Sequence, residues 1–164
     1  MLEHMKMLAQ YQIWANDHYR KNLEQLDFSK ATIQTPYGSL LDLIVHIFGA
    51  VELWMKRIEG FSPKSIRTGE NYKDWKTVMS DWEEIDKNLL DYIEKVSEKD
   101  LTKIIAYTSI EGKNHKLSID HILLQAIAQH QSYHRGQIAV ILRENGLPPV
   151  RATDYVYYKL EQQK

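Results

Sequence analysis

The 164-residue sequence contains no cysteine. The chain itself therefore offers no disulfide, no thiolate metal ligand and no cysteine nucleophile. Acidic and basic side chains nearly balance, at 22 Asp plus Glu against 21 Lys plus Arg, so no excess positive charge exists to attract nucleic acid. No run of about 18 apolar residues occurs, and charges interrupt the N-terminal segment every few residues. We expect no membrane-spanning helix, no secretory leader and a cytoplasmic location.

Glycine and proline are scarce, at 7 and 4 residues, and most of them gather between four long stretches of the chain. Each long stretch carries apolar residues at the three- to four-residue spacing of an amphipathic helix. Four such helices in a chain of this length predict an all-α four-helix bundle and a single domain over residues 1–164. The four predicted helices run from about His4 to Leu26, Leu40 to Glu59, Tyr72 to Val96 and Ile119 to Asn145.

The connections between these segments are longer than an up-down-up-down bundle requires, which favours an overhand connection. Between the third and fourth segments, residues 104–108 are β-prone and residues 111–114 are turn-like. They predict a short hairpin or an irregular connection. The tail from residue 152 onward predicts a short extra helix, whose tyrosines would either cover a pocket or dock by burying aromatic area.

The seven histidines are the most informative feature of the sequence. With Ile119 at zero and about 100° per residue, His130 and His134 fall at about 20° and 60°, inside the apolar stripe. Two histidines four residues apart on one face can hold a metal ion, although two core-edge histidines bonded to backbone carbonyls would show the same spacing. His46 flanks the stripe of the second segment and could supply a third ligand, or be a boundary residue with its own hydrogen bond. A shared cation would satisfy buried imidazoles that otherwise cost stability.

Two polar residues beside these histidines each have two interpretations. Asp42 lies four residues before His46 and could accept its ring N–H. The better-supported interpretation is that Asp42 and Ser39 cap the second helix. Gln137 lies one turn after His134, where it could orient a bound water or substrate, or form a hydrogen bond between helices.

Three further positions bear on the surroundings of the site. Trp14 and Asn16 could line a cavity beside a metal ion, or pack against a neighbouring element or a second copy. Arg135 falls at about 160° on the same helical wheel. That angle lies off the apolar stripe and predicts a surface salt bridge.

Three stretches together resemble a known family: residues 11–16 (YQIWAN), 43–54 (LIVHIFGAVELW) and 128–138 (AQHQSYHRGQI). Over nearly its whole length the sequence is similar to the DinB/YfiT-like family of metal-dependent enzymes. The resemblance implies a four-helix bundle with one divalent metal ion per chain, zinc or nickel. It also implies that His46, His130 and His134 bind this ion, and that the protein is a homodimer.

Some relatives in this family transfer a small-molecule thiol, such as bacillithiol or mycothiol, to an electrophile. Three neutral imidazoles leave a metal ion with its full charge and an open position, which suits activation of a thiol. Because the chain lacks cysteine, the thiol would have to be a co-substrate. The expected function is therefore thiol transfer through a metal-bound thiolate.

Two alternatives remain open. A metal-dependent hydrolase would use a bound hydroxide, which normally works with a nearby carboxylate base. Gln131 and Arg135 follow the two histidines of the fourth segment, and Glu52 is predicted to face away from His46. The other alternative is a non-catalytic bundle that binds metal adventitiously or acts through dimerisation. No catalytic residue beyond the metal ligands is assigned.

Overall fold

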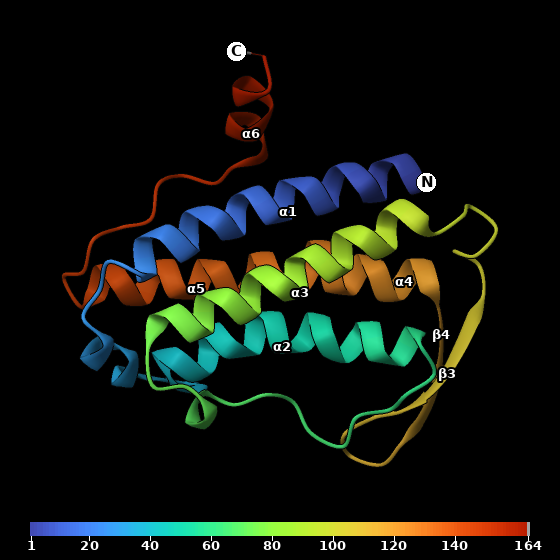
Figure 1. Ribbon diagram of the computed structural model, residues 1–164, viewed down its shortest axis with the longest axis horizontal. Coiled ribbons are helices and arrows are strands. Elements are labelled where there is room, and N and C mark those ends of the chain that lie inside the picture. Colours follow the sequence, from blue (N-terminus) through green and yellow to red (C-terminus); the bar gives the residue numbers. More distant parts are fainter. Residues whose placement is uncertain (164) are drawn as a thin grey trace.

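Helices make up most of the structure, a computed structural model that describes residues 1–163. Four long helical rods lie side by side (Figure 1), which confirms the predicted all-α bundle. No helix in the described part of the chain is both long and apolar enough to cross a membrane. The rods are α1 (Leu2–Leu23), α2 (Leu40–Ile58), α3 (Trp75–Lys95), and a fourth composed of α4 (Ile119–Leu123), a π-helical segment (Leu124–Gln129) and α5 (His130–Glu144).

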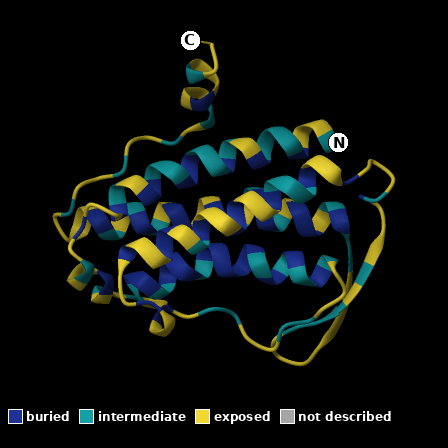
Figure 2. Ribbon diagram, viewed as in Figure 1, coloured by how far each residue is buried: buried dark blue, intermediate teal, exposed yellow. Residues whose placement is uncertain are grey.

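The rods pack as a closed ring around one apolar core. Helix α1 contacts α3 and the π-helical segment, while α2 contacts α3 and α5. Buried residues occupy the facing sides of all four rods (Figure 2). Trp82 and Phe48 are the largest of the fully buried side chains, and their rings lie 5.9 Å apart between α3 and α2. The predicted apolar stripes therefore form the core of the bundle.

Helices α2 and α3 run in the same direction because the connection between them returns along the bundle (Figure 1). Near the end of this connection, the short helix Gly69–Asn71 contacts α2. The backbone N–H of Gly69 donates to the Asp42 carboxylate, in the first turn of α2, at 2.9 Å. The overhand connection that the loop lengths favoured is thus present.

Asp42 acts as a helix cap. The Ser39 hydroxyl accepts the Asp42 N–H at 3.1 Å, and the Asp42 carboxylate accepts the Ser39 N–H at 2.8 Å. Burial opposes ionisation, but these bonds and the one from Gly69 outweigh it, so the pKa of Asp42 lies below its usual value. Both carboxylate oxygens are engaged by this cap and by Gly69. The capping interpretation is therefore confirmed.

Two hairpins connect the rods. Strands β3 (Ile104–Thr108) and β4 (Asn114–Ser118) pair antiparallel, with Tyr107 opposite His115, and confirm the hairpin predicted before the fourth helix. A second, very short pair was not predicted: β1 (Gln34–Thr35) and β2 (Gly38–Ser39). Its turn precedes α2 directly, after the short helix Phe28–Thr32. This turn places Tyr37 close to the histidines described below.

The C-terminal tail forms helix α6 (Tyr155–Glu161), as predicted, and lies outside the four-rod bundle (Figure 1). Tyr158 is buried, and its ring lies 5.6 Å from the ring of Trp14 on α1. The Trp14 indole N–H donates to Glu161 at 2.7 Å. Trp14 therefore packs against the tail, the second of its two predicted roles. Tyr155 and Tyr158 dock the tail by aromatic contact, whereas Tyr157 is exposed.

The cap of α2 generates a testable prediction. We expect Asp42→Ala to lower the free energy of unfolding by about 1–2 kcal/mol, because the Ser39 and Gly69 N–H groups lose their acceptor. Asp42→Asn retains one acceptor oxygen and should lose less. Urea denaturation followed by circular dichroism measures both. An unchanged midpoint for Asp42→Ala would contradict the capping role.

Candidate metal centre

In the fourth rod, a different side of the helix faces the core after the π-helical segment than before it. A π turn accommodates one extra residue, and each residue of an α-helix advances about 100°, so everything beyond the turn is rotated by about that angle. The prediction that Arg135 lies on the surface is therefore wrong: its exposed fraction is 3%. The angles predicted from Ile119 for His130 and His134 are wrong for the same reason, and His130 is half-buried at the edge of the core rather than inside the apolar stripe. The buried residues of α5 are Gln131, His134, Arg135, Ile138 and Leu142.

A buried polar network holds α5 in this rotated position. The Gln131 side-chain N–H donates to the Ala126 carbonyl inside the π-helical segment at 2.8 Å. Asn16 of α1 is fully buried and donates to Gln131 at 2.7 Å and to Asp86 of α3 at 3.0 Å. Arg135 in turn donates to the Asn16 oxygen at 2.8 Å. Asn16 therefore links three rods within the core instead of lining a metal cavity.

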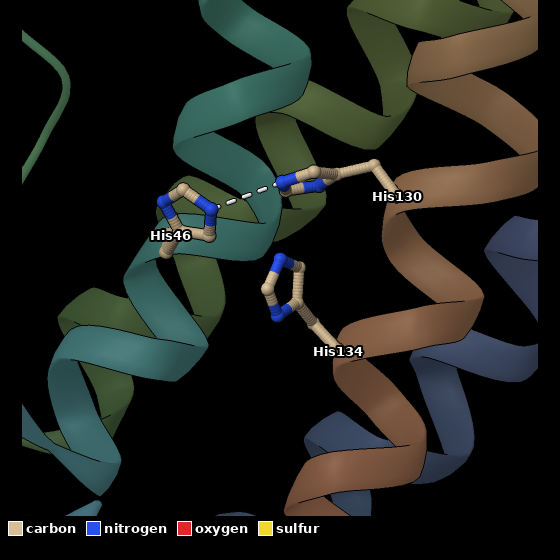
Figure 3. Close-up of side chains that lie close together, drawn as sticks. All are labelled: His46, His130 and His134. Carbon is tan, nitrogen blue, oxygen red and sulfur yellow. Dashed lines mark hydrogen bonds between the residues drawn. The ribbon is translucent and has the colours of Figure 1, made fainter. Parts of the chain in front are cut away.

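Three histidines converge between α5 and α2. His130 and His134 point from α5 toward His46 on α2 (Figure 3). The Nε2 atoms of His46 and His130 lie 3.0 Å apart, and one ring nitrogen from each histidine lies within 4.8 Å of the others. His134 is buried and the other two are half-buried. The structure thus brings together all three residues that the sequence singled out.

Burial favours the neutral form of these rings. It lowers the pKa of His46, His130 and His134, and the neighbouring imidazoles add to the effect for His46 and His130. The pKa of His130 falls to about 3. Neutral imidazole is the form that binds a metal ion. Burial therefore favours the form of all three rings that could coordinate a cation.

Gln137 fixes the tautomer of His134. Its side-chain oxygen lies 2.7 Å from His134 Nδ1. An amide oxygen can only accept, so Nδ1 carries the proton and Nε2 keeps its lone pair for a metal ion. The Gln137 amide N–H also reaches the Tyr37 hydroxyl at 3.5 Å. Gln137 therefore orients a candidate ligand, and it also bridges α5 to the turn before α2.

Two tyrosines beside the cluster were not anticipated from the sequence. The Tyr37 ring stacks on His46, with centroids 6.3 Å apart and planes 21° apart, and meets His134 edge-on at 5.2 Å. Tyr133 lies 5.0 Å from the His134 ring. Adjacency to His134 could have drawn attention to Tyr133. For Tyr37 the available signal was its position in the Pro-Tyr-Gly turn just before the cap of α2.

A helical bundle whose core edge gathers three neutral imidazoles from two rods defines a class of protein able to bind one metal ion. The DinB family model matches residues 1–164, and the chain belongs to the DinB family. Its fold is similar to that of a DinB-like protein from Bacillus cereus ATCC 10987. The TM-score is 0.65 at 20% identity, and the match covers 87% of this chain and 91% of the other. No curated protein matches the sequence.

The lowered histidine pKa values predict a pH-dependent stability. His130 has a pKa of about 3 when folded against 6.5 for the free side chain, so the unfolded chain binds more protons below pH 6.5. The stability that this shift provides is full above 6.5 and declines as the pH falls toward 3. We expect the free energy of unfolding of metal-free protein to fall from pH 6.5 downward, and less steeply in His130→Ala. Parallel urea titrations at several pH values measure this, and identical slopes would contradict it.

The hydrogen bond from His134 to Gln137 generates a second prediction for this site. We expect Gln137→Leu to weaken binding of a divalent metal about 10- to 100-fold, because the tautomer and orientation of His134 are no longer fixed. Gln137→Glu keeps an acceptor oxygen and should bind like the wild type. Competition against a chelating dye measures both affinities. Equal losses in the two variants would exclude this orienting role.

Proposed function

We propose that the protein is a metal-dependent enzyme that transfers a low-molecular-weight thiol to an electrophile. The observation that carries the proposal is the convergence of three neutral imidazoles, with one ring nitrogen each within 4.8 Å. Nitrogen ligands on two rigid rods suit zinc or nickel, and three protein ligands leave a position for a reactant. His46, His130 and His134 would hold the ion. The fit rests on their neutral state and on the tautomer that Gln137 fixes.

In this proposal, the side chains around the cluster have different roles. A metal ion held there would act as a Lewis acid and lower the pKa of a bound thiol. The three histidines would hold this ion, and the Gln131 network keeps α5 rotated so that His130 and His134 face α2. The ring of Tyr37 lies over one face of His46, nearly parallel to it. The chain has no cysteine, so the thiol must come from solution.

Hydrolysis is the less favoured chemistry because the carboxylates of Asp42 and Glu52 are engaged in other contacts. Asp42 caps α2 with both carboxylate oxygens engaged. Glu52 pairs with Arg67 at 2.6 Å and with Lys56 at 2.8 Å. These cations hold the pKa of Glu52 below its usual value, which makes it a weaker base. Neither carboxylate is therefore available to activate a metal-bound water.

Metal content is the first test of this proposal. We expect about one zinc or nickel ion per chain in untagged protein as purified, since three neutral nitrogens are ready to bind it. His46→Ala and His134→Ala should each lose the ion. His121→Ala removes an exposed histidine of α4 outside the cluster and should keep it. Absence of bound metal, with no stabilisation by added zinc or nickel, would favour a non-catalytic bundle.

Activity provides the second arm of this test. Holoprotein should join bacillithiol to a chlorinated dinitrobenzene, lose this activity with a chelator, and regain it with zinc or nickel. Product formed without a thiol would favour the hydrolase alternative. Activity that resists the chelator would contradict the metal mechanism. The homodimer implied by the family resemblance stays a prediction, which sedimentation of the same sample checks.

A further inference from the structure

A mainly apolar groove of about 380 Å³ lies between α5 and the turn that precedes α2. Its volume is in the range of small-molecule sites, about 300–1,000 Å³. Large apolar side chains lining it are unusually open to solvent: Tyr133 is 62% exposed, Val140 52% and Tyr37 43%. Exposed apolar side chains that gather in a depression, rather than singly, indicate a binding surface.

The groove shares a wall with the histidine cluster. Tyr37 lines the groove and contacts the rings of His46 and His134. Gln137 lines it as well and is bonded to His134 Nδ1. Tyr133 lines it and packs on the same ring. A molecule in the groove would therefore lie against the residues that surround two of the three candidate ligands.

The lining also indicates the charge of the occupant. Glu144 is the one charged residue among the lining residues, and the groove contains no lysine or arginine. A carboxylate beside an apolar surface disfavours an anion and tolerates a neutral or cationic molecule. The two tyrosine rings offer faces on which an aromatic or aliphatic body can pack.

We propose that this groove binds the electrophilic co-substrate, as a neutral or cationic molecule with an aromatic or aliphatic body. The inference rests on the proposed function, since it names the molecule that accepts the thiol. The thiol sulfur supplies the electron pair of the new sulfur–carbon bond. The bond from that carbon to the leaving group breaks, the leaving group departs with its electron pair, and the thiol proton passes to solvent.

Gly136 provides a direct test of the groove. It lies on α5 in the lining, and a Cβ added there meets no atom within 4 Å. Gly136→Leu should therefore fill the groove without backbone strain, and leucine favours the helix more than glycine. The matched control is Arg143→Leu, which places the same side chain on an exposed position of α5 outside the lining.

Three probes of one shape report the charge preference: 2-naphthalenemethanol, 2-naphthylmethylamine and 2-naphthoate. They are titrated calorimetrically into metal-free protein, so the result does not depend on the metal centre. We expect one saturable site for the neutral and cationic probes and weaker binding of the anion. Gly136→Leu should weaken the neutral probe about tenfold or more, as expected when a hydrophobic pocket loses its space. Arg143→Leu should bind it like the wild type.

A separate variant tests the preference of the groove for a cationic over an anionic probe. Glu144→Gln should reduce the advantage of the cationic over the anionic probe about two- to fivefold, the size of an exposed charge interaction. Stronger binding of 2-naphthoate than of the neutral probe would overturn the assigned charge class. Equal affinity of the neutral probe for Gly136→Leu and the wild type would overturn the site.

The link to the metal centre is tested separately with cobalt-loaded protein. A saturating neutral probe should shift the visible absorption of Co²⁺, because Tyr37 and Gln137 contact the candidate ligands. The shift should be absent in Gly136→Leu. An unchanged spectrum in the wild type would overturn the assignment of the groove to this centre. Failure to retain Co²⁺, with probe binding intact, would instead refute the metal centre of the proposed function.

Discussion

The rotated face of the fourth rod is the constraint on which the candidate site depends. One extra residue in the π-helical segment turns α5 by about 100° relative to α4. Without that rotation, Gln131 and Arg135 would not both enter the core. The Gln131 amide stabilises the turn by bonding to the Ala126 carbonyl, which the altered backbone leaves accessible. The same rotation directs the side chains of His130 and His134 toward α2 and away from the centre of the core.

Four polar residues between the helices are tolerated in the core because they are hydrogen-bonded to one another. Asn16, Asp86, Gln131 and Arg135 are buried, and each finds a partner in another rod. Removing one partner would leave others unsatisfied in a medium of low dielectric constant, so the network specifies a single arrangement of the rods. That rigidity serves the histidines, since metal coordination requires ligand atoms held within fractions of an ångström.

The surroundings of the cluster divide into two kinds of chemistry. On one side lie three imidazoles whose neutral form is favoured by burial and whose ring nitrogens could coordinate a cation. On the other side lies the apolar groove that shares Tyr37 with them. This arrangement suits a reaction between a polar nucleophile and an apolar acceptor, because the histidine cluster can bind the first and the apolar groove the second. Gln137 belongs to both sides, through His134 and through the groove lining.

The sequence by itself determined the bundle, the caps and the three histidines. Apolar spacing is a local property, so the four rods, the Ser39–Asp42 cap and the α6 tail were all predictable. The identities of His46, His130 and His134 followed from the four-residue spacing of the last two and from the family resemblance, although the helical angles predicted beyond residue 129 were wrong. Only the tertiary structure showed where the side chains of Arg135, Asn16 and Tyr37 lie and which residues they contact. A π turn breaks the uniform angle, and contacts between residues far apart in the chain carry no periodic signal that one sequence could reveal.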